Sequence, residues 1–159
     1  VELKNVPDFQ RYTASTAFVE GWGLYSEQLA NEMGLYSNDV QQLGRLGNDA
    51  WRACRLVLDT GMHGMGWSRD SAIDFFRSNS PIEEINANIE TDRYIAWPGQ
   101  ACSYKMGQLT IEQLRQKAEE ELGEKFDIRY FHDEVLCDGG ITLPILENKI
   151  DSFIEKFRN

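Results

Sequence analysis

Apolar side chains recur along the chain with the 3.6-residue period of an α-helix. In the first such segment, Phe18, Trp22, Tyr25 and Leu29 follow one another at steps of four, three and four residues. This spacing places them along one side of a helix, which we expect to face the core. No run of alternating β-branched residues interrupts the pattern, so almost no strand is predicted. The chain is therefore expected to be all-α.

Helix start and stop signals predict a single helical domain of about seven helices over residues 13–159, with residues 1–12 as an N-terminal extension. The first helix is predicted over 13–33, before Gly34, and the second over 38–60, before Gly61. Residues 61–66 are rich in glycine and predict a loop. Ser68 is expected to begin the third helix.

The remaining helix starts are predicted from capping residues. Ser80 precedes Glu83, and Thr110 precedes Gln113, at the three-residue distance of a capping box, so each is expected to begin a helix. Pro98–Gly99 breaks the chain after the first of these helices, a helix through Ser103 and Tyr104 is expected to follow, and the helix that begins at Thr110 leads to Gly123. Asp127 and Thr142 are the expected caps of the last two helices.

Composition excludes several classes of partner. The chain has 159 residues with 16 basic and 26 acidic side chains, a net charge of −10. Nucleic acid is therefore not expected as a partner. Apolar stretches are far shorter than the roughly 20 residues that cross a bilayer, so no membrane contact is expected from this segment.

The chain begins at Val1 and not at Met, which we interpret as a piece of a longer protein. Its location therefore stays open. The three cysteines, Cys54, Cys102 and Cys137, lie far apart and match neither a disulfide framework nor a zinc-binding spacing. We expect them to be small buried side chains.

Metal and nucleophile motifs are incomplete. A catalytic zinc site needs three protein ligands, yet the only histidines are His63 and His132, with no HExxH or CxxC. The chain alone cannot supply such a site. Signatures of serine hydrolases, P-loop proteins and dinucleotide-binding folds are also absent.

The most informative segment is Phe18–Glu27, in which Glu20 lies among apolar residues and two glycines, Gly21 and Gly23. Glycine inside a helix costs about 1 kcal/mol relative to alanine, which a helix tolerates where something approaches its backbone closely. On periodicity alone, Glu20 instead belongs to a solvated face opposite the apolar stripe. An exposed patch of Glu20, Gly23 and Leu24 would favour self-association of the chain.

Five motifs along nearly the whole chain resemble one family. The sequence is similar to the bacterial domain-of-unknown-function family 885 from about Thr13 to Phe157. The matching stretches are Ala17–Tyr25, Arg55–His63 with Gly66–Ser68, Arg93–Tyr94, Pro98–Lys105 and Phe131–Asp133.

This resemblance implies the C-terminal part of a larger, all-helical zinc-peptidase-like fold. In such HExxH-plus-Glu enzymes, an upstream helix supplies two histidines and a general-base glutamate, and a second helix donates a third ligand. Glu20 matches that third ligand. Zinc is thus the implied cofactor, a peptide the implied substrate, and the bacterial cell envelope the implied location. Gly23 departs from the alanine more frequent in the family.

The resemblance also implies roles for four further residues. Arg93 and Tyr94 are similar to an Arg-Tyr pair of the angiotensin-converting class of zinc peptidases, in which the tyrosine hydroxyl stabilises the oxyanion. The alternative is a packing tyrosine beside a surface arginine. His63 would bind substrate or the tetrahedral intermediate, or be a solvated loop histidine, and Tyr104 would line the cleft. His132 is expected to be structural.

Two functions remain as alternatives. The first is the C-terminal part of a zinc-dependent peptidase, inactive as an isolated chain because HExxH is missing. The second is a non-catalytic helical binding or structural module. An HExxH helix encoded upstream would distinguish the first from the second.

Overall fold

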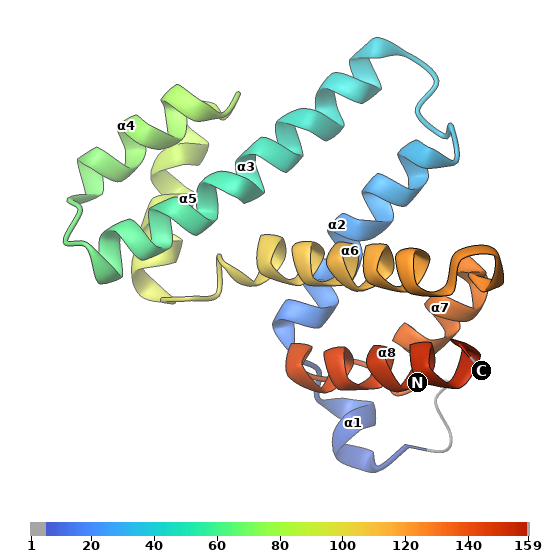
Figure 1. Cartoon of the computed structure of the whole chain (residues 1–159). Helices are drawn as coiled ribbons and strands as arrows, with labels where there is room; N and C mark the ends of the chain where they lie inside the picture. Colours follow the sequence, from blue (N-terminus) through green and yellow to red (C-terminus); the bar gives the residue numbers. More distant parts are fainter. Residues whose placement is uncertain (1–5, 159) are drawn as a thin grey trace. The chain divides into compact units, whose positions relative to one another are not determined.

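The computed structural model describes residues 6–158, and this part of the chain is helical without strands (Figure 1). The prediction of an all-α fold is confirmed. The described residues form eight α-helices rather than seven, because a short helix lies in the predicted N-terminal extension. They are α1 (Asp8–Tyr12), α2 (Thr16–Glu32), α3 (Asp39–Gly64), α4 (Arg69–Asn79), α5 (Glu84–Ala96), α6 (Ser103–Leu122), α7 (Ile128–Leu136) and α8 (Leu143–Arg158), with a 3₁₀ turn, η1 (Gly123–Lys125), after α6.

The chain divides into two compact units, and the boundary passes through α2 and α6. The first unit comprises residues 1–23 and 106–159, and the second comprises residues 24–105. In the first unit, the buried apolar side chains of α6, α7 and α8 include Ile111, Phe131 and Ile150, each fully buried. The amide of Ser15 donates to the carbonyl of Gly140 at 2.8 Å, which fixes the start of α2.

Within the first unit, α2 and α6 touch through their backbones. A methyl group at Gly107 of α6 would overlap the carbonyl oxygen of Ala17, and one at Gly21 of α2 would overlap the backbone of Gly107. The close approach that glycine in α2 predicted is thus found at Gly21. No atom lies within 4 Å of a methyl group at Gly23. Helix α6 runs without a break through Thr110, which was wrongly expected to begin a helix.

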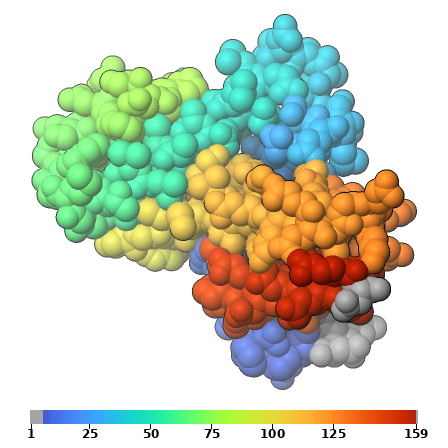
Figure 2. Space-filling model, viewed as in Figure 1, coloured from blue at the N-terminus to red at the C-terminus, as the bar shows by residue number. Residues whose placement is uncertain are grey.

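The second unit is built on α3, against which α4 and α5 pack (Figure 2). Its core is a cluster of buried side chains from α3, α4, α5 and the segment after α5: Cys54, Leu58, Ala72, Ile73, Phe76, Ala87, Tyr94 and Ala101. The ring of Phe76 contacts those of Trp51 and Tyr94, at centroid distances of 6.1 and 6.3 Å. These aromatic contacts join the three helices.

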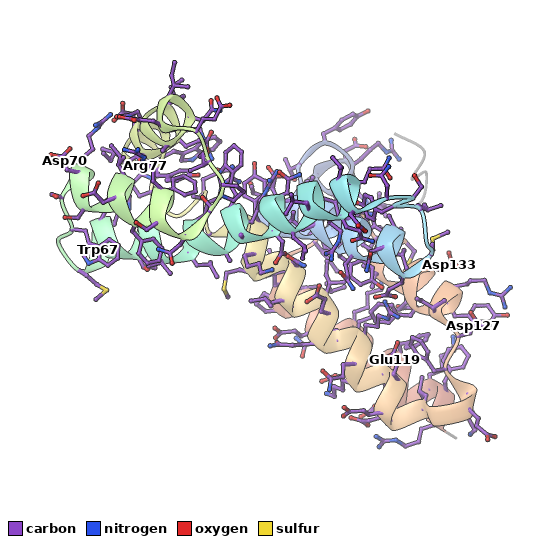
Figure 3. All side chains as sticks on the ribbon, turned by 90° about the horizontal axis from the view of Figure 1, so that it is seen from above. Trp67, Asp70, Arg77, Glu119, Asp127 and Asp133 are labelled. Atoms are coloured by element: carbon purple, nitrogen blue, oxygen red, sulfur yellow. The ribbon has the colours of Figure 1, made fainter. Side chains whose placement is uncertain are left out.

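Several predicted helix ends are confirmed by the capping bonds. Asn38, Ser68 and Asp127 accept hydrogen bonds from the backbone amides of Gln41, Ser71 and Arg129. In α4, Asp70 lies in the first turn and Arg77 in the last, so both charges suit the helix dipole (Figure 3). Ser80 was wrongly expected to begin α5. Its hydroxyl donates to the carbonyl of Phe76 at 2.8 Å and so closes α4.

Helix α3 extends beyond its predicted end. It continues through Gly61 to Gly64, so His63 lies in the last helical turn and not in a loop. Trp67 packs against Gly61, where an added methyl group would lie 2.7 Å from its ring. The amide of Trp67 also donates to the carbonyl of Gly61 at 2.9 Å. Gly61 is needed for this contact and does not end the helix.

Two expectations about burial are corrected. Leu24 was placed on the solvated face of the first helix, yet it is buried beside Tyr25 in the sequence, so it cannot belong to an exposed patch. The burial of consecutive residues widens the apolar face of α2. Of the cysteines, Cys54 is buried as expected, Cys102 is half-buried, and Cys137, after the last turn of α7, is exposed.

Candidate functional site

Four of the predicted site residues, Arg93, Tyr94, His63 and Tyr104, lie in the second unit. Arg93 and Tyr94 are in the last part of α5, His63 is in the last turn of α3, and Tyr104 is in the first turn of α6. Glu20 lies in the part of α2 that belongs to the first unit.

Tyr94 is the centre of a hydrogen-bonded network. Its side chain is fully buried, and its hydroxyl donates to Oε2 of Glu90 at 2.8 Å. The Tyr94 hydroxyl oxygen itself accepts from Nε of Arg55 at 2.9 Å and from the indole nitrogen of Trp51 at 3.4 Å. Burial is the main cause that raises the pKa of Tyr94 to about 12. The phenol is therefore neutral at physiological pH, and its proton is engaged.

Glu90 links the network to Arg93, one helical turn away. Oε2 of Glu90 accepts from Arg93 at 3.0 Å and from Arg55 at 3.1 Å, as well as from Tyr94. Burial acts to raise the pKa of Glu90, but hydrogen bonds from Arg93 and Tyr94 and the positive charges of both arginines outweigh it. The pKa of Glu90 therefore lies below its ordinary value. Glu90 carries a negative charge that holds two guanidinium groups together.

Arg55 brings Tyr104 into the same group. Its guanidinium carbon lies 4.2 Å from the centroid of the Tyr104 ring, a cation–π contact in a desolvated position, since Arg55 is only 5% exposed. Nη1 of Arg55 has no hydrogen-bond partner in the described part of the chain. The next residue of α6, Lys105, pairs with Asp49 of α3 at 2.6 Å and fixes this end of α6.

The hydroxyl groups of the two tyrosines at the site differ in their hydrogen bonding. The Tyr94 hydroxyl is saturated, whereas the half-buried Tyr104 makes its ring contact with Arg55 and no hydrogen bond to the residues that the structure describes. Chemically, the cluster offers two guanidinium groups and one free phenol. Such groups suit the stabilisation of negative charge.

His63 is bound to a second buried carboxylate, that of Asp59, one turn earlier in α3. Nδ1 of His63 lies 3.2 Å from Oδ1 of Asp59 and 2.9 Å from the Asp59 carbonyl oxygen. The Asp59 carboxylate also accepts from the amide of Gly99, at 3.0 and 2.9 Å. Gln100, the next residue, accepts from Arg93 at 2.7 Å. The Pro98–Gly99 turn is therefore held from both α3 and α5.

Sequence reasoning missed Arg55, Asp59 and Glu90 as individual residues. Arg55 is the first residue of the Arg55–His63 motif, and Asp59 lies in its middle. That motif was identified as a whole, without a role for either residue. Glu90 precedes Arg93 and Tyr94 by three and four residues, the helical spacing at which side chains meet. That spacing was the available signal for Glu90.

In the first unit, Glu20 is half-buried and makes no hydrogen bond or ion pair with the described residues. Its neighbour Gly21 packs on α6, and Gly23, two residues further along α2, is exposed. His132 of the same unit contacts the ring of Trp22 edge-on at 5.5 Å. Within residues 6–158, no three His, Cys, Asp or Glu side chains could hold a metal ion together.

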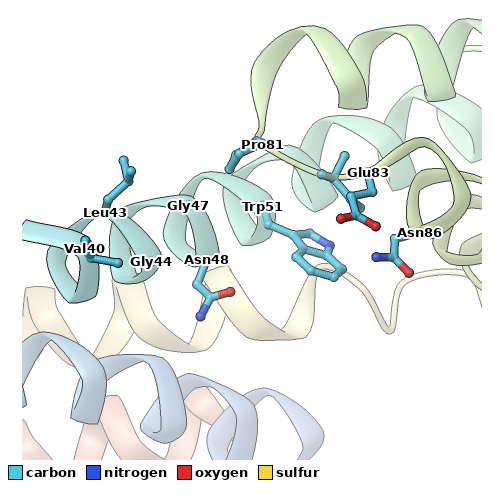
Figure 4. Close-up of a pocket in the computed structure, with 10 residues that line it drawn as sticks. Val40, Leu43, Gly44, Gly47, Asn48, Trp51, Pro81, Glu83 and Asn86 are labelled. Carbon is cyan, nitrogen blue, oxygen red and sulfur yellow. The ribbon is translucent and has the colours of Figure 1, made fainter.

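One pocket of the second unit, of about 440 Å³, lies beside this network. It is lined by residues of α3 and of the segment that leads into α5: Val40, Leu43, Gly44, Gly47, Asn48, Trp51, Pro81, Ile82, Glu83 and Asn86. Figure 4 shows Trp51 at one end of the pocket, near Glu83 and Asn86, with Val40 and Leu43 at the other. None of the predicted site residues lines it.

A solved structure resembles this chain closely. It is the crystal structure of a protein from Colwellia psychrerythraea described as a "putative lipoprotein", with 42% sequence identity and a TM-score of 0.91. The match covers 94% of this chain and 26% of that protein, so the chain spans about a quarter of its length. None of the described helices is both long enough and apolar enough for a bilayer crossing.

Curated proteins give no match to this sequence. A family model does match, over residues 1–150, nearly the whole chain. It describes bacterial proteins of unknown function, DUF885. The chain therefore belongs to this family, as its motifs indicated.

Proposed function

We propose that this chain is the part of a zinc-dependent peptidase that supplies one metal ligand and the groups that bind substrate and stabilise the oxyanion. The observation that carries the proposal is the convergence of separate motifs on one network. Arg55, Arg93 and Tyr104 come from three motifs, and Glu90 and Tyr94 join them through hydrogen bonds and a cation–π contact.

The described residues offer one possible zinc ligand and not a complete zinc site. The Glu20 carboxylate is a ligand of a type that zinc accepts, and no residue of the described chain competes for it. No cluster of three ligands exists within residues 6–158, so the other ligands would come from elsewhere in a longer protein. When bound, zinc would polarise the scissile carbonyl and lower the pKa of the attacking water.

The free phenol suits the oxyanion better than the engaged one. Tyr94 would have to give up its hydrogen bond to Glu90 before it could donate to substrate. Tyr104 has no such bond to break, and the Arg55 guanidinium beside its ring adds positive charge. We therefore propose that Tyr104 donates to the oxyanion, that Tyr94 holds Arg55 and Glu90 in place, and that Arg93 anchors Gln100.

The similarity to a protein described as a "putative lipoprotein" supports a location in the bacterial cell envelope. A peptidase there would meet peptides outside the cytoplasm. We propose the same location for the protein to which this chain belongs.

The deciding experiment compares zinc content and peptidase activity of the full-length protein with those of a Glu20→Gln variant. Glu27→Gln, on the same helix, is the matched control, and the 159-residue chain is a second control. We expect stoichiometric zinc that is lost in Glu20→Gln and kept in Glu27→Gln, with no activity in the short chain. Full-length protein without zinc, or zinc unchanged in Glu20→Gln, would refute the proposal and leave a non-catalytic helical module.

A further inference from the structure

The side chain of His63 is held on one edge only. Both atoms near its Nδ1, the carboxylate Oδ1 and the carbonyl oxygen of Asp59, are hydrogen-bond acceptors. Asp59 is 4% exposed, and both its carboxylate oxygens accept from the Gly99 amide. The carboxylate is therefore fixed in position by the turn that it holds.

An acceptor pair at Nδ1 determines where the imidazole carries its proton. Neutral histidine has one protonated and one unprotonated ring nitrogen, and only the protonated one donates. Nδ1 must therefore carry the hydrogen, and the lone pair is left on Nε2. The His63 side chain is 30% exposed, and Nε2 makes no hydrogen bond to the described residues.

We propose that Asp59 is a positioning residue that fixes His63 in the Nδ1–H form, so that Nε2 accepts a hydrogen bond from an N–H group of a bound peptide. This role deepens the proposed function and rests on it for the identity of the ligand. The geometry itself involves neither metal nor substrate. In the Nδ1–H form Nε2 cannot donate, so in this form His63 binds a peptide N–H and not the oxyanion.

The test is the ring tautomer of His63, read from ¹H–¹⁵N correlations of the two histidine rings of the ¹⁵N-labelled chain at about pH 8. A His132→Gln variant assigns the signals. We expect the Nδ1–H pattern for His63 in the unaltered chain. Asp59→Ala removes the carboxylate and keeps the main-chain carbonyl oxygen 2.9 Å from Nδ1, so the ratio of Nδ1–H to Nε2–H should fall by about tenfold, and a ratio held by the carbonyl alone would show no fall.

Asp49→Asn, an aspartate of the same helix that pairs with Lys105, is the matched control and should keep the Nδ1–H pattern. If Asp59→Ala does not fold, the spectrum of the unaltered chain decides, because a predominant Nε2–H pattern there overturns the proposal. An unchanged tautomer in folded Asp59→Ala also overturns it. Gly99 amide exchange should accelerate in Asp59→Ala, whereas an unaltered rate would contradict the anchoring role.

Zinc and activity do not enter this measurement, so its failure is distinguishable from that of the proposed function. The peptide-binding part is tested in full-length protein with His63→Gln. A higher KM with kcat little changed is expected, and an unchanged KM would overturn it.

Discussion

The Tyr94 hydroxyl donates a 2.8 Å hydrogen bond to Glu90, the same carboxylate that pairs with Arg55 and Arg93. The buried Tyr94 hydroxyl thus donates a further hydrogen bond to the Glu90 carboxylate that pairs with both arginines. Removing any member leaves a charged group short of a partner, and such a loss is costly in a buried position.

Tyr94→Phe should lower the free energy of unfolding by about 1–3 kcal/mol, because Glu90 and Arg55 each lose a partner. Tyr104→Phe is the control. Its hydroxyl makes no hydrogen bond to the described residues, so its stability should change by less than about 0.5 kcal/mol. Urea denaturation of both variants measures the difference. Equal stability of the two would contradict the network.

The low pKa of Glu90 predicts a pH dependence of stability. Because the folded-state pKa lies below the ordinary value of 4.5, the ionised carboxylate stabilises the fold above that pH. This contribution is lost as pH falls through the lowered folded-state pKa. Glu90→Gln should therefore be less stable than the unaltered chain at pH 7, and the difference should shrink below about pH 4. Unfolding curves between pH 3 and 7 check this; a difference that is constant with pH would be inconsistent with it.

Catalysis distinguishes the two phenols. In active full-length protein, Tyr104→Phe should lower kcat about 10²–10³-fold if its hydroxyl donates to the oxyanion. Its unfolding free energy should stay unchanged, unlike that of Tyr94→Phe. Steady-state kinetics with a peptide substrate provides the measurement. Full activity of Tyr104→Phe would return the oxyanion role to Tyr94.

The two glycines of the Glu20 segment should respond oppositely to alanine. At Gly21 a methyl group overlaps the backbone of Gly107, so Gly21→Ala should destabilise the chain by about 1–3 kcal/mol. At Gly23 the space is open, and Gly23→Ala should stabilise it by about 0.5–1 kcal/mol. Thermal unfolding of both variants tests this pair, and a shift of the same sign in both would show that the helix contact is misassigned.

Gly61 and Gly64 provide a similar comparison within α3. Gly61→Ala would press a methyl group to 2.7 Å from the Trp67 ring and should destabilise the chain by about 1–3 kcal/mol. Gly64→Ala meets no neighbouring atom and should not destabilise it. Chemical denaturation measures both changes. A neutral Gly61→Ala would mean that Trp67 can move aside.

The sequence predicted the helical class and most helix ends because periodicity and caps are local signals. Asn38, Ser68 and Asp127 act within three residues of themselves. Gly61 was misread because a neighbour in space, the ring of Trp67, decides its role. Ser80 was misread because its hydroxyl bonds back to Phe76 and closes the preceding helix. Thr110 lies inside α6, and no single contact of the described residues explains why its capping pattern is not used.

The residues of the candidate site likewise divide into those that local sequence signals indicate and those that depend on contacts distant in the sequence. Motifs indicated Arg93, Tyr94 and Tyr104, and Glu90 could have been inferred from helical spacing. The Asp59–Gly99 contact joins residues 40 positions apart, and no periodicity reports such a distance. Burial of Tyr94 likewise depends on the packing of Phe76 and Trp51 from two other helices.

The Pro98–Gly99 turn, held by Asp59 of α3 and through Gln100 by Arg93 of α5, has a consequence for the folding pathway. Each anchor joins the turn to a helix, so the final conformation of the turn depends on both helices being in place. Interactions absent from the transition state govern the unfolding rate rather than the folding rate. If both anchors close only after the transition state, loosening the turn shortens the lifetime of the native state and leaves the speed of refolding almost untouched.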